Sequence, residues 1–382
     1  MKKIDNLTTV IVFSLFLLLL GAGGWVLKDK AFSANENRVL QQRPAVTAEA
    51  LLSGEFEEAF QKYQDDQFPF RDSWITLKTA TKLALLSKDL NGVYLGKDGY
   101  LIEKISDEDA DQELFASNLQ AVKAFCEKLP TGLSKSVILV PTTAAIMKEK
   151  LPAGAAPFEE GAYAKAAARQ LQSVNYVDLY NEFGKKRDRA LYYRTDHHWT
   201  TEGAMLAYDV WKQFMGQSGI SLKQLHKRLL SDDFQGSLYS KVLWDDGTRD
   251  QVTAYIGERQ MHSRVIADGQ TLGGMYQEQF LREKDKYAVF FGGNYGSVEV
   301  DTGNQNGKHL LIIKDSFANA FAPFAAEDFD KVFLIDLRYF SGNLMDYVEE
   351  NHITDVLILY SMSNMIKDKN ISALKSGGNI LS

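Results

Sequence analysis

The most regular pattern along the chain is an alternation of short, unbroken apolar runs with segments of helical periodicity, which begins near residue 115. The apolar runs lie at 136–141, 309–315, 331–336 and 355–361, with helix-like segments before and between them. Strands of a parallel sheet are buried on both faces, so they read as continuous Leu, Ile and Val rather than as alternating apolar and polar residues. The pattern therefore predicts a three-layer α/β domain, in which helices cover both faces of a mostly parallel central sheet.

Three further segments have a local pattern of their own. A β-hairpin is predicted over 92–104, because two short β-prone runs flank the turn 97–99, which contains the Asp-Gly turn signal. A helix is predicted over 201–216 from its apolar periodicity. Residues 221–290 mix polar and aromatic residues without long periodic runs, and we expect them to form an insertion in the α/β domain.

The N-terminal segment is apolar over a length that matches a lipid bilayer. The stretch from Leu7 to Leu27 follows two lysines and carries no charge, and its length of about 21 residues is enough to cross a membrane as a helix. Trp25 lies where an interfacial aromatic residue is expected. We predict an uncleaved signal anchor with its short basic tail in the cytoplasm. The alternative is a cleaved signal peptide, for which the small residues at 31–34 offer a cleavage site.

These patterns divide the chain into three parts. Residues 1–28 are expected to be a cytoplasmic tail and transmembrane anchor, and residues 29–75 an extracytoplasmic linker and helical segment. Residues 76–382 are expected to form the α/β domain, outside the cytoplasm. The prediction for localisation is therefore a single-pass protein of the cell membrane.

Composition and charge exclude several classes of function. The net charge is -7 and the Lys and Arg residues are scattered, whereas nucleic-acid binding needs a basic face, so no nucleic-acid partner is expected. The single cysteine excludes a disulfide framework and a Cys-rich zinc site. Cys126 lies in a helical pattern beside apolar residues, and we interpret it as a buried apolar side chain.

Ser316 follows the apolar run 309–315 and precedes a helical pattern. In open parallel sheets, ligand-binding and catalytic residues lie beyond the carboxyl ends of the strands. A helix that begins there points free N–H groups at whatever the serine attacks, which suits a developing oxyanion. The hypothesis is that Ser316 is a nucleophile. The alternative is that it only caps the helix, since serine is a favoured N-cap residue.

The segment "RTDHHWT" at 194–200 supplies what a serine nucleophile needs. A serine hydroxyl requires a base, and the base requires a group that orients it. Side chains two apart on an extended or turning segment point the same way, so Asp196 can orient His198 as the base for a serine. His197 is expected to point the opposite way, as a structural residue or a donor to substrate. Trp199 is expected to form an apolar wall or a sugar platform, with core packing as the alternative.

Metal binding is a competing interpretation of the same segment. Zinc needs three or four ligands, and adjacent histidines do not easily chelate one ion. The other four histidines are scattered singly along the chain. No metal is therefore expected, and a purely structural role for this segment remains a further alternative.

Two motifs, "TDHHWTTEGA" and "IIKDSFANAFAPF", follow an N-terminal apolar segment in this chain. In this combination the chain resembles the DHHW protein family, which is similar to the alginate O-acetyltransferases AlgX and AlgJ within the SGNH-hydrolase-like superfamily. The resemblance covers most of the chain beyond the anchor. It implies the SGNH-type α/β/α fold in a permuted block order, with the catalytic residues Ser316, His198 and Asp196 and no cofactor. It also implies O-acetylation of a cell-surface or secreted polysaccharide, with acetyl groups supplied by an MBOAT-type membrane protein.

The resemblance also implies that hydrogen-bond donors near Ser316 stabilise an oxyanion. Where the superfamily has a Gly-Asp-Ser block, this chain has Lys314 in place of the glycine, which puts the details of the oxyanion hole in doubt. The backbone N–H of Ser316 is the safest donor. Asn294, Arg338 and Tyr339 are weaker candidates for oxyanion or substrate binding. For Asn294 a turn is an equal alternative, and for Arg338 a salt bridge.

Three functions remain open at this point. The first is acetyl transfer to a polysaccharide through an acetyl-serine intermediate. The second is a polysaccharide acetyl esterase with the same three residues and water as the acceptor. The third is a polysaccharide-binding or assembly subunit without catalysis.

Overall fold

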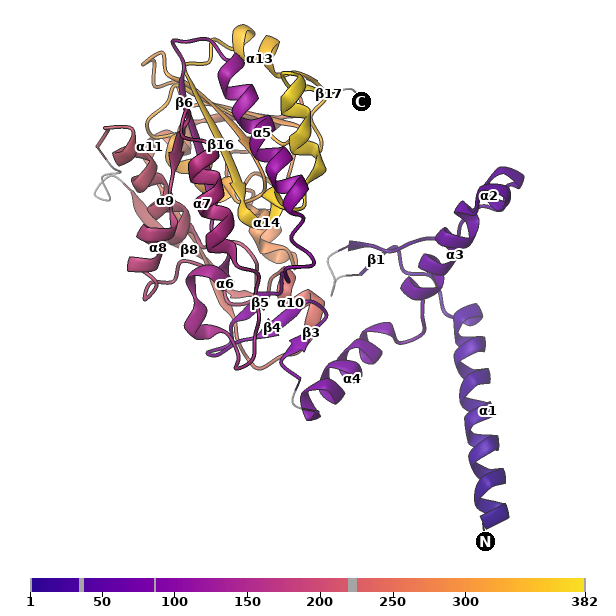
Figure 1. Ribbon diagram of the computed structural model, residues 1–382. Helices are drawn as coiled ribbons and strands as arrows, with labels where there is room; N and C mark the ends of the chain where they lie inside the picture. The colour runs from indigo at the N-terminus through magenta and orange to yellow at the C-terminus, as the bar shows by residue number, and fades with distance from the viewer. Residues whose placement is uncertain (1, 34–37, 86, 219–224, 381–382) are drawn as a thin grey trace. The chain divides into compact units, whose positions relative to one another are not determined.

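The computed structural model describes residues 2–33, 38–85, 87–218 and 225–380 (Figure 1). The chain forms two compact units. The first comprises Met1–Ser87 and Ser240–Trp244, and the second comprises Lys88–Tyr239 and Asp245–Ser382. Each unit is described by itself.

The first unit is built from helices. Its long helix α1 (Lys2–Val26) contains the apolar window Leu7–Gly24, whose mean hydropathy is 2.2 and none of which is buried. Within the described residues it is the one helix long and apolar enough to cross a membrane, a test that a signal sequence also passes. Ala34, the end of the alternative cleavage site, lies outside the described residues. The other elements are α2 (Ala48–Ser53), α3 (Glu55–Asp66), α4 (Arg71–Ala84) and the two-stranded pair β1 (Phe32–Ser33) and β2 (Arg38–Val39).

The second unit is organised around an eight-stranded sheet with the order β11-β10-β12-β14-β13-β16-β6-β7. Neighbours from β14 to β7 are parallel, and the three strands at the other edge are antiparallel. The four apolar runs become β6, β13, β14 and β16, next to one another at the centre. The strands are β6 (Ser134–Val140), β7 (Asn175–Val177), β10 (Arg264–Ala267), β11 (Gln270–Leu272), β12 (Ser297–Asp301), β13 (His309–Lys314), β14 (Lys331–Ile335) and β16 (Asp355–Ser361).

Both faces of the sheet are buried at its four central strands β6, β13, β14 and β16, which is why these strands form nearly continuous apolar runs. On β13, Leu310 and Ile312 pack into one core cluster, and Leu311 and Ile313 pack into a second cluster on the opposite face. The mixed α/β fold predicted from the apolar runs is thus confirmed. The first face is covered by α9 (Thr201–Phe214) and α12 (Ala318–Ala325), and the second by α5 (Gln112–Lys128), α7 (Glu160–Gln170), α13 (Leu344–Glu350) and α14 (Met362–Met365). Figure 1 shows α5 running alongside β6 and β16.

Several local predictions are confirmed as well. The hairpin consists of β4 (Val93–Leu95) and β5 (Leu101–Glu103), which pair antiparallel around a turn in which Asp98 and Gly99 have φ of +57° and +76°. The expected helix over 201–216 is α9, capped by Thr200, whose side chain accepts from the N–H of Gly203. Cys126 is buried in α5, and burial raises the pKa of its thiol to about 12.

The segment expected to be an insertion contains its own two-stranded sheet. Its residues 221–224 lie outside the described residues. Strand β8 (His226–Phe234) pairs antiparallel with β9 (Asp250–Ile256), and α10 (Ser237–Val242) lies between them in the chain. Further along, β10 and β11 join the main sheet as its edge, and the short helices η3 (Glu278–Arg282) and η4 (Lys286–Val289) follow.

Candidate active site

Ser316 lies just beyond the carboxyl end of β13, at the centre of the parallel part of the sheet. Helix α12 begins at Ala318, and the residue at its N-cap position is Phe317, which makes no side-chain cap. The helix therefore starts later than the sequence indicated, and Ser316 does not cap it. The hydroxyl of Ser316 is therefore available to a hydrogen-bond partner other than the helix.

That partner is His198, from the segment 194–199. The Nε2 atom of His198 lies 2.7 Å from Oγ of Ser316, and Nδ1 lies 2.6 Å from Oδ1 of Asp196. The segment is a turn rather than an extended strand, closed by a β-bridge between Tyr192 and Trp199. Oδ1 of Asp196 also accepts from the backbone N–H of His198 at 2.9 Å, an Asx-turn contact that keeps the carboxylate beside the imidazole. The structure thus brings Asp196, His198 and Ser316 together.

Burial and charge define the protonation states of the two groups. Burial alone would raise the pKa of Asp196, but the adjacent His197 and His198 and the hydrogen bonds from His198 and Ser237 outweigh it and hold that pKa well below its ordinary value. Burial, together with His197, lowers the pKa of His198 to about 4, although Asp196 opposes this shift. At neutral pH the imidazole is therefore uncharged. Its Nδ1–H donates to the Asp196 carboxylate, and Nε2 accepts from the hydroxyl of Ser316.

Tyr287, at the end of the insertion in η4, contacts the side chain of His198 and the main chain of Ser316. Its ring stacks on the imidazole of His198 with centroids 3.8 Å apart and planes 7° apart. Its hydroxyl donates to the carbonyl oxygen of Ser316 at 3.0 Å. Burial raises the pKa of this phenol well above its ordinary value, so it remains protonated. The sequence contains no signal for this residue, which is one of many aromatic residues in a segment without periodicity.

The Asp196 carboxylate is held from the other side by the turn that follows β8. The N–H of Ser237 donates to Oδ2 of Asp196 at 2.7 Å, and Oγ of Ser237 lies 2.6 Å from Nδ1 of His197. Gly236 packs directly against Asp196, and a Cβ at this position would overlap the carboxylate. The close approach therefore requires glycine here. A Gly-Ser pair is too common in turns for the sequence alone to have indicated this contact.

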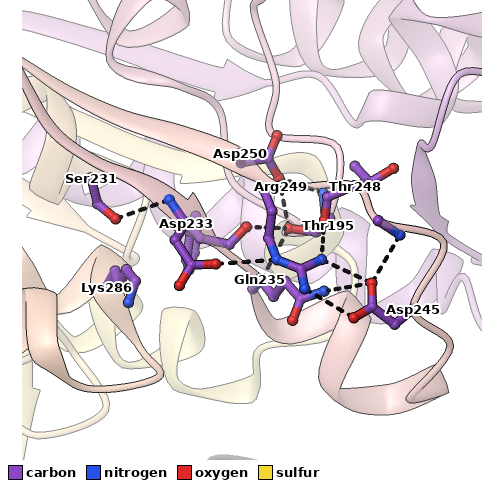
Figure 2. Close-up of polar contacts among 12 residues, drawn as sticks. Thr195, Ser231, Asp233, Gln235, Asp245, Thr248, Arg249, Asp250 and Lys286 are labelled. Atoms are coloured by element: carbon purple, nitrogen blue, oxygen red, sulfur yellow. Dashed lines mark hydrogen bonds and ion pairs between the residues drawn. The ribbon is translucent and has the colours of Figure 1, made fainter.

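A second buried carboxylate, Asp250, fixes the residues that precede Asp196. Its Oδ2 accepts from the N–H and the hydroxyl of Thr195 at 2.7 and 2.6 Å, and its Oδ1 accepts from the N–H of Arg194 at 2.9 Å. Figure 2 shows Asp250 beside Thr195, with Arg249 turned toward Asp233 and Asp245. The hydroxyl of Thr195 accepts in turn from the N–H of Gly236 at 3.1 Å. Asp250 was missed because a single Asp at the start of a strand has no distinctive sequence pattern.

The predictions for the two residues beside His198 need correction. His197 does not point away: its ring centroid lies 3.9 Å from that of His198, and its side chain is 34% exposed. Trp199 is completely buried, donates from Nε1 to the carbonyl oxygen of Phe317 at 2.9 Å, and stacks with Phe321. It is therefore a core residue and cannot act as a sugar platform. The period-two argument fails because the segment is a turn, in which neighbouring side chains can lie on the same side.

The weaker candidates gather around Lys314 and Asp336. Oδ1 of Asn294 accepts from Nζ of Lys314 at 3.0 Å. Arg338 donates to both carboxylate oxygens of Asp336, from Nε at 2.8 Å and from Nη2 at 2.6 Å, which is the salt-bridge alternative. Tyr339 is 59% exposed, and the guanidinium of Arg338 lies 5.3 Å from its ring centroid.

Within the described residues, one group of His, Cys, Asp and Glu side chains has the spacing of a metal site, and it consists of Asp196, His197 and His198. Their ligand atoms lie within 4.8 Å of one another. However, Nδ1 of His198 is hydrogen bonded to Oδ1 of Asp196. The N–H of Ser237 donates to Oδ2 of Asp196, and Oγ of Ser237 is hydrogen bonded to Nδ1 of His197. A zinc ion here would have to displace these contacts, so the donor set fits a hydrogen-bonded catalytic group better than a metal.

The sequence of this chain is similar to those of several known proteins. A family model described as DHHW protein matches residues 162–335. The protein named probable alginate O-acetylase AlgJ from Pseudomonas aeruginosa is 28% identical to this chain over 194 residues. The match covers 49% of this chain and 46% of the relative. The protein of that name from Pseudomonas fluorescens is 28% identical over 212 residues, covering 52% and 50%. The chain thus spans about half the length of these relatives.

Solved structures resemble a larger part of the chain. A DHHW family protein from Eubacterium siraeum is 25% identical, with a TM-score of 0.63 over 76% of this chain and 97% of the other. Bacillus cereus PatB1, solved with a sulfonyl adduct, is 20% identical, with a TM-score of 0.58 over 74% of this chain and 98% of the other, and shares the fold. The matched residues 162–335 contain Asp196, His198 and Ser316, and the resemblance of this chain to the DHHW protein family, predicted from its sequence, is confirmed.

Proposed function

We propose that this protein is a membrane-anchored O-acetyltransferase that modifies a polysaccharide outside the cytoplasm through an acetyl-serine intermediate. The observation that carries the proposal is the continuous pair of contacts from Asp196 to His198 at 2.6 Å and from His198 to Ser316 at 2.7 Å. Each distance is within the range required for proton transfer between a nucleophile, its base and the group that orients the base.

In the first half-reaction, Nε2 of His198 takes the proton of Ser316 as Oγ forms a bond to the acetyl carbon of the donor. The bond to the donor's leaving group then breaks, and that group receives the proton from His198. In the second half-reaction His198 takes a proton from a sugar hydroxyl, whose oxygen attacks the acetyl-serine. Ser316 leaves and recovers the proton. Asp196 stays ionised throughout and stabilises the imidazolium, as in other triads of this kind.

The charge that develops on the acetyl oxygen needs hydrogen-bond donors. The backbone N–H of Ser316 has no partner among the described residues, and it lies close to the reacting hydroxyl at the beginning of α12. It is therefore the first donor that we assign to the oxyanion.

The relatives support the choice of acceptor. The AlgJ proteins are named as alginate O-acetylases, and alginate is a polysaccharide, so a hydroxyl-bearing polymer is the acceptor that we propose here. Helix α1 is long and apolar enough to anchor the chain. An anchor would keep the second unit near a membrane protein of the MBOAT type that supplies acetyl groups.

The test uses the full chain in detergent with a chromogenic acetyl ester, with and without an oligosaccharide acceptor. Ser316→Ala and His198→Ala should each lower ester turnover by at least about 10³-fold, because the members of a triad act as a unit. Ser173→Ala and His262→Ala, at exposed positions, serve as matched controls. Wild-type turnover in both site variants would overturn the proposal. Acetylated sugar identifies a transferase, whereas free acetate alone, in the presence of acceptor, identifies an esterase.

A further inference from the structure

A small pocket lies beyond the carboxyl ends of β6 and β16, beside the candidate active site. It shares walls with that site, because His197 and Phe317 line it. The ring centroid of Phe317 lies 6.0 Å from that of His197 and 5.0 Å from that of His198. Phe317 also follows Ser316 directly in the chain. The pocket is therefore adjacent to the proposed nucleophile and its base.

Most of the other residues that line the pocket are polar. Thr142 and Thr143 come from the segment after β6, Ser363 from the segment after β16, and Glu103 from the end of β5. The volume of about 20 Å³ holds one group of the size of a water molecule. A single hydroxyl group of a ligand fits this space, whereas a whole sugar ring does not.

Thr143 gives the pocket a polar group without a partner. The residue is 6% exposed, and its hydroxyl has no hydrogen-bond partner among the described residues. A buried hydroxyl without a hydrogen bond costs free energy, so this position suits a ligand that supplies the missing bond. The ring of His197 uses Nδ1 for its contact with Ser237, and its Nε2 has no partner within the described part of the chain.

The segment that carries Thr143 is held in place by a buried carboxylate. Oε1 of Glu160 accepts from the N–H of Thr142 at 3.0 Å, and Oε2 accepts from the hydroxyl of Thr142. The hydroxyl of Tyr180 donates to Oε1 as well, and Glu160 itself is 3% exposed. The backbone at Thr143 is thus fixed before a ligand arrives, which lowers the entropic cost of binding.

The groups around the pocket match a hydroxyl better than a methyl group or a carboxylate. A hydroxyl can both donate and accept, and the pocket offers both functions, with Glu103 as an acceptor and Thr143 as a donor. A methyl group would leave the Thr143 hydroxyl without a partner. A carboxylate would lie near the negative charge of Glu103, which Lys367 at 3.7 Å only partly balances.

We propose that this pocket binds a second hydroxyl group of the acetyl acceptor, close to the hydroxyl that receives the acetyl group, and that Thr143 recognises it. The inference rests on the proposed acetyl transfer and deepens it, because it names the acceptor class: a neutral sugar or polyol unit with at least two hydroxyl groups. Water has no second hydroxyl to place in the pocket, so this contact would favour transfer over hydrolysis.

The experiment uses the full chain in detergent and the chromogenic acetyl ester, with 1-propanol, propane-1,2-diol or propane-1,3-diol as the acceptor at equal concentration. The ratio of acetylated alcohol to free acetate reports how the same acetyl-serine is divided between alcohol and water. In the wild-type chain at least one diol should give, per hydroxyl group, a ratio about fivefold above that of 1-propanol, as expected for one added hydrogen bond. Thr143→Val should abolish this preference. Thr143→Ser, which keeps the hydroxyl, should retain it, and Thr271→Val on the exposed edge strand β11 is the matched control.

The preference for a neutral acceptor is tested with 3-hydroxypropanoate, which has a carboxylate where propane-1,3-diol has its second hydroxyl. Its ratio should lie about threefold or more below that of the diol, and Glu103→Gln should narrow the difference. Equal ratios for the acid and the diol in the wild-type chain, or a difference that Glu103→Gln leaves unchanged, would overturn the assignment to neutral acceptors.

The role of the pocket is rejected if the diols and 1-propanol give equal ratios in the wild-type chain, or if the preference for a diol persists in Thr143→Val. If alcohols are acetylated in that case and Ser316→Ala is inactive, the proposed function still stands. Activity in Ser316→Ala, or acetylation of none of the acceptors by the wild-type chain, would mean that the proposed function itself fails. Should thermal unfolding show that Thr143→Val does not fold, Thr143→Ala and Glu103→Gln provide the decision.

Discussion

The two halves of the candidate active site are supported in different ways. The nucleophile side, residues 309–319, continues from a strand that is hydrogen bonded to parallel neighbours on both sides. The base side, residues 194–199, is an irregular turn held by the side chain of Asp250, at the start of β9, and by the main-chain N–H groups of Gly236 and Ser237, between β8 and α10. One half is supported by the main-chain ladder of the central sheet, and the other by a few hydrogen bonds that each involve one particular side chain.

This difference predicts unequal tolerance to substitution. A backbone ladder does not depend on the identity of any single side chain, so the nucleophile side should keep its geometry when residues near it change. On the base side each hydrogen bond depends on one particular residue, and a buried donor left without its acceptor costs about 1–3 kcal/mol. The changes below test this contrast, beginning with the largest expected effect.

Asp196→Asn is expected to have the largest effect on activity and also to lower stability by about 1–3 kcal/mol, because an amide leaves one of the N–H groups of His198 and Ser237 without its acceptor. An amide in this position can donate to the imidazole and favour the wrong tautomer, which removes the acceptor nitrogen from Ser316; the expected loss in kcat is about 10⁴-fold. Measurements of ester turnover and of thermal unfolding check both parts, with the exposed Asp107→Asn as a matched control. A loss of less than tenfold would mean that Asp196 does not orient His198.

Gly236→Ala should lower kcat by about 10²-fold, since the added methyl group overlaps the Asp196 carboxylate and displaces it. The appropriate control is Gly132→Ala, where the new Cβ meets nothing within 4 Å. Equal activities of the two variants would show that the base side is more adaptable than its contacts suggest.

The pH profile should separate the two sides. The pKa of His198 is lowered, so the imidazole is neutral at pH 7, and kcat/KM should fall about tenfold per pH unit only below about pH 4. Lys314, which is buried two residues before Ser316 and lies 3.6 Å from the Asp336 carboxylate, would lose its charge as the pH rises through a pKa of about 8, so an alkaline limb there would belong to the nucleophile side. Lys314→Gln should remove the alkaline limb and leave the acid limb in place. If both limbs moved together in this variant, the two sides would not be independent. Circular dichroism across the range distinguishes titration from acid unfolding.

Arg249→Ala is expected to have the smallest effect. Arg249 neighbours the buried Asp250 in sequence, but it pairs at the surface with Asp233 at 3.1 Å and Asp245 at 2.8 Å (Figure 2). Exposed pairs of this kind contribute about 0–1 kcal/mol, so the free energy of unfolding should change by less than that, and kcat by less than about twofold. A larger loss of activity would extend the base side to this surface cluster.

The comparison also explains what could be predicted from the sequence. The strands of the nucleophile side are buried on both faces, and this burial leaves a continuous apolar pattern, so the sheet, the carboxyl end of β13 and the position of Ser316 could be inferred. Asp196 and His198 could be inferred as partners because they lie two residues apart.

The supports of the base side could not be inferred in this way. Asp250, Gly236 and Tyr287 act across 40 to 90 residues of chain, from a segment whose sequence has no long periodic runs because its elements are short. The direction of His197 was predicted wrongly for the same reason, and the choice between core packing and a sugar platform for Trp199 stayed open, since both depend on the shape of a turn. Lys314 was noticed only as a departure from a glycine, because its partners come from loops that follow other strands.

The Tyr287 ring also has a consequence for the proposed catalytic cycle. It lies 3.8 Å from the imidazole of His198 and almost parallel to it, and its hydroxyl is hydrogen bonded at 3.0 Å to the main chain of Ser316. With this ring on its face and Asp196 on Nδ1, the imidazole has no room to rotate. In the proposed reaction, a proton accepted by Nε2 would therefore be released from the same atom, first to the departing donor and later to the serine. Each turnover would end with the imidazole in its starting orientation, so the site needs no separate step to reset itself before the next acetyl group arrives.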